Sequence, residues 1–327
     1  MADENKMIRP AAPTFPEIPD AQHAVEAAQP RLPRPVPRKK RHGDRKEGRL
    51  LRTIYPMNKF MPFIMPERSD ACNTYADELD VTETDLFCKE MIRKGYENFS
   101  FLHLMVAAYV RVVSQKPGLN RFISGQRIYS RNNIEMTMTV KKTMSADSPD
   151  TCIKVILEPD DTVIDVYQKL NAVIEANKAT SDLDSDFDKT AEKLSKTPRF
   201  ILRNVVKLLN WLDYHGWLPQ ALLDVSPFHG SMIITDMGSL RLGPVYHHIY
   251  NFGTLPVFIA FGAKRHSYEL DRHGEFVDRK VADFKFVLDE RIVDGHYYAA
   301  FLNRLRYYFE HPELLELPPE TVIEDVD

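Results

Sequence analysis

The pattern of apolar positions predicts a strand and a helix on either side of one turn near the C-terminus. Phe284, Phe286 and Leu288 alternate with other residues, as in a strand with one buried face. The pair Asp294-Gly295 then predicts a tight turn, because glycine accepts positive φ and aspartate can bond nearby backbone amides. Beyond the turn, apolar residues at helical spacing predict one buried helix face: Phe301, Leu305, Tyr308 and Phe309.

Further strands and helices are predicted upstream of this turn. A long helix is indicated by an unbroken apolar stripe: Leu102, Met105, Val106, Tyr109, Val110 and Val113. Strands are expected near residues 74–81, 127–129, 134–140 and 153–157. A helix is expected to begin with Thr82 as its N-cap and to turn three apolar side chains inward: Phe87, Met91 and Ile92. Another helix is expected after Asp160-Asp161-Thr162. We expect residues 45–317 to form one domain.

Residues 180–225 predict an elaborated helical segment within this domain. Thr180 to Ser195 is polar and acidic, which favours a loop with a short helix. Pro198 begins an amphipathic helix with apolar residues on or near one face: Ile201, Val205, Leu208, Leu209, Trp211 and Leu212. This face either packs on its own subunit, or covers a neighbouring subunit or a substrate entrance.

Both ends of the chain are predicted to be tails. Residues 1–44 are rich in proline, lack apolar periodicity and end in a basic run, Arg38 to Arg41. Such a composition predicts disorder. The basic run is either a solvated linker or a contact for a protein partner, nucleic acid or a membrane surface. Residues 318–327 form an acidic C-terminal tail.

Composition narrows the class of protein. With 43% hydrophobic and 28% charged residues, the chain resembles soluble globular proteins, and its formal charge of −4 argues against bulk nucleic-acid binding. No apolar run reaches the length of a membrane span. Three scattered cysteines favour reduced thiols in a cytoplasm. His247-His248 lacks ligands at metal spacing, so we expect structural or surface histidines and no metal site. We expect no lipoyl-type domain ahead of the core and no lipoyl group on this chain.

Five segments of the chain, at residues 117–120, 235–238, 256–264, 290–295 and 312–315, resemble motifs of the chloramphenicol acetyltransferase-like superfamily, which includes the catalytic domains of 2-oxoacid dehydrogenase E2 acyltransferases. Residues 290–295, Glu-Arg-Ile-Val-Asp-Gly, resemble the family pattern His-x-x-x-Asp-Gly, and 312–315 resemble its Pro-Glu-Leu-Leu ending. Residues 235–238, Thr-Asp-Met-Gly, resemble a strand that ends in Ser-Asn-Leu-Gly, and an apolar strand follows at 256–264. Residues 117–120, Pro-Gly-Leu-Asn, resemble the family's Pro-x-Leu-Asn.

The resemblance implies a fold and an activity. The implied fold is an α/β two-layer sandwich, a mixed sheet covered by helices. The implied assembly is a homotrimer, alone or built into larger cages of trimers, with the site between adjacent subunits. The implied activity is acyl transfer with coenzyme A or acyl-CoA as co-substrate and with no metal. Thr235 is then the oxyanion hydroxyl, and Asp294 pairs with Arg68 or Arg52. The remaining motif residues are structural: Gly295, Asp236 and Gly238.

Glu290 occupies the position of the family's catalytic histidine. Glutamate is the weaker base by about two pKa units, or roughly 3 kcal/mol of proton-transfer driving force. Three interpretations stay open. Glu290 is a general base with a raised pKa, His296 has taken over the role, or the site is silent. In the last case the chain is a trimeric scaffold that recruits partners through its N-terminal tail.

Overall fold

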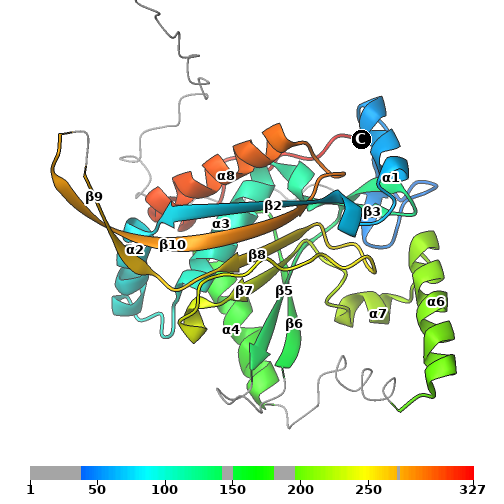
Figure 1. Ribbon diagram of the computed structural model, residues 1–327, viewed down its shortest axis with the longest axis horizontal. Coiled ribbons are helices and arrows are strands. Elements are labelled where there is room, and N and C mark those ends of the chain that lie inside the picture. Colours follow the sequence, from blue (N-terminus) through cyan, green and yellow to red (C-terminus); the bar gives the residue numbers. More distant parts are fainter. Residues whose placement is uncertain (1–37, 142–149, 180–195, 271–272) are drawn as a thin grey trace, which may run out of the picture.

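The fold of the computed structural model is built on a mixed sheet (Figure 1). The structure describes residues 38–141, 150–179, 196–270 and 273–327. The strands are β1 (Gly48–Leu50), β2 (Cys72–Asp80), β3 (Arg121–Ser124), β4 (Arg127–Arg131), β5 (Ile134–Lys141), β6 (Asp150–Leu157), β7 (Met232–Asp236), β8 (Val257–Phe261), β9 (Arg265–Leu270) and β10 (Phe276–Asp289). The helices are α1 (Pro56–Ile64), α2 (Thr82–Arg93), α3 (Phe101–Gln115), α4 (Val163–Ala179), α6 (Arg199–His215), α7 (Gln220–Val225) and α8 (Gly295–Glu310).

Strand β10 organises the large sheet. The strand order is β2-β10-β8-β7-β5-β6, and β9 pairs with the first half of β10. The pairs β5–β7 and β7–β8 are parallel and the others are antiparallel, so the sheet is mixed as predicted. A smaller sheet has the order β1-β4-β3. Since β10 has β2 on one side and β8 on the other, the residue that follows its last position starts from a rigid support.

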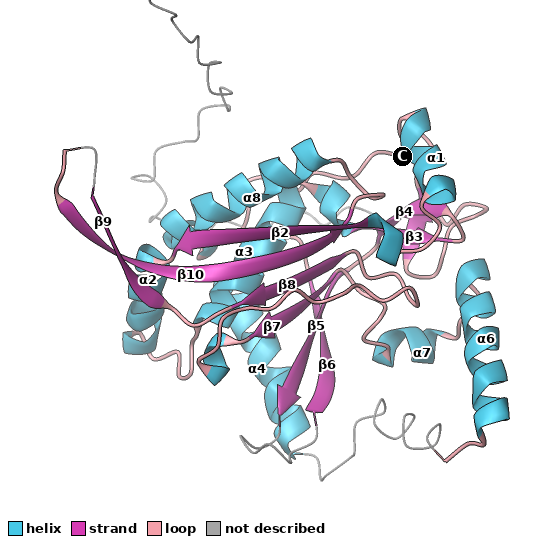
Figure 2. Ribbon diagram, viewed as in Figure 1, coloured by secondary structure: helices cyan, strands magenta, loops and turns pink. Residues whose placement is uncertain are grey.

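Helices α2, α3, α4 and α8 cover one face of the large sheet (Figure 2). Aromatic contacts join β10 to α8: the ring centroids of Phe286 and Phe301 lie 6.2 Å apart, and those of Phe284 and Phe309 lie 5.8 Å apart. Such pairs add about 0.5–1.5 kcal/mol each beyond their buried area. The predicted strand, turn and helix near the C-terminus are therefore held as one unit.

The other face of the sheet is also buried in its centre. A second cluster lies there, formed by five apolar side chains: Ile233, Ile249, Leu255, Phe258 and Val287. The alternation of Phe284, Phe286 and Leu288 predicted one buried face, but Val287 is only 2% exposed. A strand with neighbours on both sides and coverage on both faces contains apolar residues at successive positions.

Most predicted elements are present, and α2 differs in detail. The strands near 127–129, 134–140 and 153–157 correspond to β4, β5 and β6, and the long helix is α3. At the start of α2, the carboxylate of Asp80 accepts hydrogen bonds from the Thr82 amide (2.9 Å) and hydroxyl (2.6 Å). The prediction that Thr82 is the N-cap is wrong: Val81 is the N-cap, Thr82 is the first residue of α2, and Asp80 supplies the side-chain acceptor at this end of the helix. The prediction that Ile92 faces inward is wrong, since it is 51% exposed.

Helix α6 confirms the predicted helix after Pro198, but its apolar face is poorly covered. All of α6 is described, and none of its residues is buried. Phe200 is 70% exposed, and Leu208 and Trp211 are about half exposed. The rest of the chain therefore covers only part of the apolar face of α6. The predicted loop at Thr180 to Ser195 lies outside the described residues.

The described parts of both predicted tails contact the domain and each other. Arg121 binds the carboxylate of Asp325 with two hydrogen bonds, of 2.7 and 2.6 Å. Arg41 donates to Asp327 at 3.0 Å, and Arg38 forms an ion pair with Glu324. Half of the basic run is thus neutralised by the acidic C-terminus, whereas residues 1–37 lie outside the described part.

Asp85, in the first turn of α2, lies among three lysines. Its carboxylate binds Lys89 at 3.0 Å and Lys280 at 2.7 Å, and it forms a third ion pair with Lys264. Burial alone would raise the pKa of Asp85, but the three lysine hydrogen bonds outweigh it and hold this pKa well below its ordinary value. A carboxyl with a lowered pKa in the folded state stabilises the fold above its unfolded pKa of about 3.9.

Replacing Asp85 by asparagine is expected to lower the free energy of unfolding by about 1–2 kcal/mol near pH 7. The difference from the wild type should shrink as the pH falls below about 4, because the Asp85 carboxyl of the unfolded wild-type chain then takes up a proton while that of the folded chain stays ionised. Urea denaturation of both proteins over this pH range measures it. A difference that stays constant with pH would show that ionisation of Asp85 does not matter.

Candidate functional site

Glu290 is a half-exposed carboxylate held directly after β10. Its backbone N–H donates to the carbonyl of Ala71 at 2.9 Å, and its carboxylate accepts a hydrogen bond from the side chain of Asn73 at 2.8 Å. The flanking residues Asp289 and Arg291 are 1% and 3% exposed. The chain therefore presents one acidic group to solvent from a buried, fixed backbone. Sequence reasoning missed Asn73, whose position depends on the pairing of β2 with β10.

Asp289, Arg291 and Arg68 form a buried cluster behind Glu290. Arg291 binds both oxygens of the Asp289 carboxylate, at 2.8 and 2.7 Å, and also donates to the carbonyl of Met65 at 3.0 Å. Nε of Arg68 lies 3.5 Å from the same carboxylate. Burial lowers the pKa of Arg68, against the attraction of Asp289. The hydroxyl of Tyr298 donates to the backbone carbonyl of Asp289 at 2.7 Å.

The predicted pairing of Asp294 with Arg68 or Arg52 is wrong. Asp294 is exposed and is the N-cap of α8, where its carboxylate accepts the amide hydrogen bond of Tyr297 at 2.8 Å. Arg68 instead contacts Asp289, and Arg52 lies 3.4 Å from Asp44. A carboxylate at a helix N-terminus already has backbone donors and a favourable dipole, so it needs no arginine.

Gly295 does not have the positive φ that the tight-turn prediction assumed. It is the first residue of α8, and it is absent from the described residues with left-handed backbone. A Cβ added to Gly295 would have no atom of the described residues within 4 Å, so a larger side chain also fits here. The change of direction is made by residues 290–294, with Asp294 ending the turn.

Thr235, Asp236 and Gly238 lie at the carboxyl end of β7. Thr235 is half-buried. Burial raises the pKa of Asp236, whose carboxylate accepts the amide of Ser239 at 3.0 Å. A Cβ on Gly238 would lie 2.8 Å from the carbonyl oxygen of Gly262, so only glycine fits this turn.

The strand register separates Thr235 from Glu290. Thr235 lies opposite Ala260 on β8, and Ala260 lies opposite Lys285 on β10. Glu290 follows Lys285 by five positions along the same strand direction. At about 3.3 Å per residue, the two groups lie roughly 16 Å apart along the sheet. One chain therefore does not bring the proposed base and the proposed oxyanion hydroxyl together.

The histidines of the sequence analysis lie apart from this cluster of residues. His296 is exposed in the first turn of α8. His247 stacks on Phe258 with ring centroids 4.3 Å apart, and burial lowers its pKa. His248 is exposed. This agrees with structural or surface roles for the His247-His248 pair.

Within the described residues, no group of three or more His, Cys, Asp or Glu side chains is placed to hold a metal ion, and no helix has the length and apolar character of a membrane span.

Comparison with known proteins gives a match at the level of structure. The sequence matches no protein-family model and no curated protein. A probable dihydrolipoamide acetyltransferase from Listeria monocytogenes is 13% identical, with 84% of this chain and 99% of that chain covered at a TM-score of 0.52. Dihydrolipoamide acetyltransferase from Azotobacter vinelandii is 15% identical, covering 81% and 94% at 0.48, and a chloramphenicol acetyltransferase is 12% identical, covering 77% and 94% at 0.47. The chain fold implied by the sequence resemblance, a mixed sheet covered by helices, is confirmed.

Proposed function

We propose that this chain is an acyl-CoA-dependent acyltransferase, which moves an acyl group between a coenzyme A thioester and a thiol, hydroxyl or amine acceptor. The observation that carries the proposal is the position of Glu290. It is a half-exposed carboxylate directly after β10, between two buried residues, in a fold shared with a dihydrolipoamide acetyltransferase. Coenzyme A enters as co-substrate, and the proposed chemistry requires no metal ion.

In the proposed reaction, Glu290 is the general base. It takes the proton of the acceptor while the sulfur, oxygen or nitrogen of the acceptor forms a bond to the thioester carbonyl carbon. The hydroxyl of Thr235 donates a hydrogen bond to the oxyanion that forms. When the oxyanion collapses, the bond from carbon to the coenzyme A sulfur breaks, and this sulfur takes the proton back from Glu290. The acyl group has then moved and Glu290 is restored.

The identity of the base favours a thiol as the acceptor. A glutamate is a weaker base than the histidine of the family pattern by about two pKa units. A thiol has an ordinary pKa of about 8.5, far below that of an alcohol, so its proton is the easiest for a carboxylate to remove. We therefore place thiols ahead of hydroxyls and amines among the acceptors.

The separation of Thr235 from Glu290 supports a site shared between copies. If each site takes Glu290 from one copy and Thr235 from the next, a cyclic oligomer completes every site, and we propose a homotrimer. Exposed apolar side chains on α1 and α6 support such contacts: Phe60 and Phe63 are 56% and 57% exposed, and Phe200 is 70% exposed. Large exposed apolar groups of this kind commonly mark protein–protein contacts.

The first test of this function is thiol release from a panel of acyl-CoA esters, with dihydrolipoamide and small amines or alcohols as acceptors. We expect turnover with dihydrolipoamide to exceed turnover with the alcohols. Intact oligomers that release no thiol with any ester would overturn the proposal and leave the trimeric scaffold as the alternative.

The shared site has its own test, which uses mixed oligomers. Glu290→Gln and Thr235→Ala are each expected to be nearly inactive alone, because one removes the base and the other an oxyanion donor. Co-expressed in equal amounts, they should recover about a quarter of the wild-type activity, since one interface in four then combines the intact groups. Mixtures no more active than the separate variants would show that the two groups do not act across copies.

A further inference from the structure

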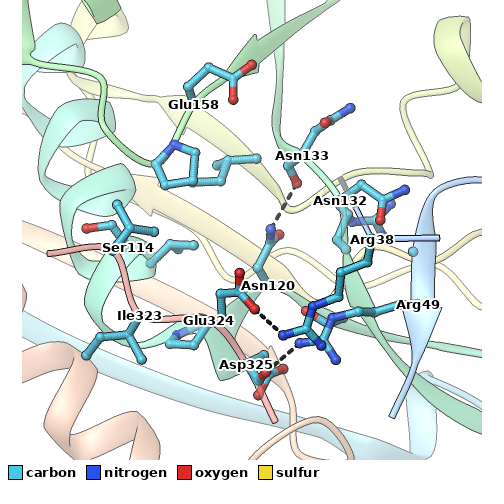
Figure 3. A pocket seen from close by; sticks show the side chains of 18 of the residues that line it. Arg38, Arg49, Ser114, Asn120, Asn132, Asn133, Glu158, Ile323, Glu324 and Asp325 are labelled. Atoms are coloured by element: carbon cyan, nitrogen blue, oxygen red, sulfur yellow. Dashed lines mark hydrogen bonds and ion pairs between the residues drawn. The ribbon is translucent and has the colours of Figure 1, made fainter. Parts of the chain in front are cut away.

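A cavity of about 900 Å³ lies outside the candidate functional site (Figure 3). Its lining comes from residues 38–49 and 320–325, the end of α3, residues 130–134, and the loop between β6 and α4. Its described lining residues include neither Glu290, Thr235 nor Asp294. A volume of this size is typical of sites for small molecules.

Three acceptor groups among the residues that line the cavity lack donors. Asp160 is 6% exposed, and its Oδ2 has no hydrogen-bond partner among the described residues. Asn120 is also 6% exposed; its amide nitrogen donates to the carbonyl of Asn133 at 2.9 Å, but its Oδ1 is unpartnered within the described chain. The carboxylate of Glu158, half-buried in the same loop as Asp160, makes no hydrogen bond or ion pair with a described residue. Buried acceptors without donors are costly and rare.

The side of the cavity across from Glu158 is basic. Figure 3 shows Glu158 on one side and Arg38 and Arg49 on the other, with Asn120 between them. Arg38 is paired with Glu324, and Arg49 donates to the carbonyl of Val326 at 2.6 Å. Lys39 and Lys40 also line the cavity, and neither forms an ion pair within the described part of the chain. The two sides therefore offer opposite charges to a ligand.

We propose that this cavity binds a small molecule with a primary ammonium group at one end and an anionic group at the other. An ammonium group has three donors and a positive charge, which match the free acceptors of Asp160, Asn120 and Glu158. The anionic end of the ligand lies towards Lys39 and Lys40, whose positive charges attract it. An amino acid or an ω-amino acid has this chemistry. The site is separate from the proposed acyl-transfer site and does not depend on it.

Isothermal titration calorimetry of the full-length protein tests this with three sets of probes. The zwitterions are glycine, γ-aminobutyrate and ε-aminocaproate, the diamines are putrescine and cadaverine, and the monoacids are butyrate and caproate. At least one zwitterion should bind about tenfold or more tightly than its diamine and monoacid counterparts, since the diamine places a like charge at the basic end and the monoacid places no charge at the acidic end. No saturable binding, or equal binding of the monoacids or diamines, would overturn the proposal.

Variants separate the two ends of the ligand. Asp160→Asn and Glu158→Gln should each weaken zwitterion binding by about tenfold, because a charge-assisted hydrogen bond is lost. Lys39→Gln combined with Lys40→Gln should weaken zwitterions but not diamines. The matched control is Glu83→Gln, an exposed acid on α2, which should leave binding unchanged. Thermal melting checks that each variant folds. Unchanged zwitterion affinity in folded Glu158→Gln and Asp160→Asn would show that these carboxylates do not bind the ammonium group, and would overturn the proposal.

Discussion

Replacing Glu290 by glutamine is expected to lower kcat/KM for acyl transfer by about 10²–10⁴-fold, the range that general bases contribute. Glutamine has nearly the same shape and can still accept the hydrogen bond from Asn73, but it cannot take a proton from the acceptor. The free energy of unfolding should change by less than about 0.5 kcal/mol, because the side chain is half-exposed and forms no ion pair with a described residue. Steady-state thiol release and urea denaturation measure the two quantities.

Two further variants test whether the loss of activity is specific to the base at position 290. Glu313→Gln, an exposed acid after α8, is the matched control and should retain full activity. Glu290→His restores the residue of the family pattern, and as the stronger base it should be at least as active as the wild type. Wild-type rates in Glu290→Gln would mean that another group is the base, and His296→Asn then tests the remaining candidate. An inert wild type with an active Glu290→His would show that the pocket is intact but the natural role is different.

Local patterns in the sequence predicted the elements that carry the site. Strand β10 and helix α8 follow from apolar spacing, because each buries a continuous face, and α3 follows from an unbroken stripe. The N-cap role of Asp294 was also open to local reasoning, since Asp before a helical pattern is a common cap. Glycine's freedom of φ instead suggested a tight turn at Gly295, and the family resemblance suggested an arginine partner for Asp294.

Features that depend on tertiary contacts were not predictable from the sequence. Asp289, Glu290 and Arg291 are charged and show no apolar pattern, yet Asp289 and Arg291 are buried beneath residues 65–68. No local pattern shows that a segment more than 200 positions away covers them. The separation of Thr235 from Glu290 likewise depends on how β7, β8 and β10 are aligned, which the individual strands do not specify.

Asp289→Asn is expected to lower the free energy of unfolding by about 3–5 kcal/mol, the cost of removing one partner from a buried ion pair. The substitution leaves the guanidinium groups of Arg68 and Arg291, which are 4% and 3% exposed, without a counter-ion. Asp283→Asn is the matched control on the same strand: its carboxylate is 40% exposed and pairs with Arg265 at 3.2 Å. That change should cost less than about 1 kcal/mol. Urea denaturation measures both.

A second substitution tests the cause of this loss. If the cost comes from uncompensated positive charge, then adding Arg68→Met to Asp289→Asn should restore part of the stability, because one buried cation is removed and a side chain of similar length fills its place. Arg68→Met alone should be destabilising, since it removes the hydrogen bond to the carbonyl of Tyr250 at 2.8 Å. If the two losses simply add, the buried charges do not interact strongly. In that case Asp289 holds the backbone around Glu290 through its geometry rather than its charge.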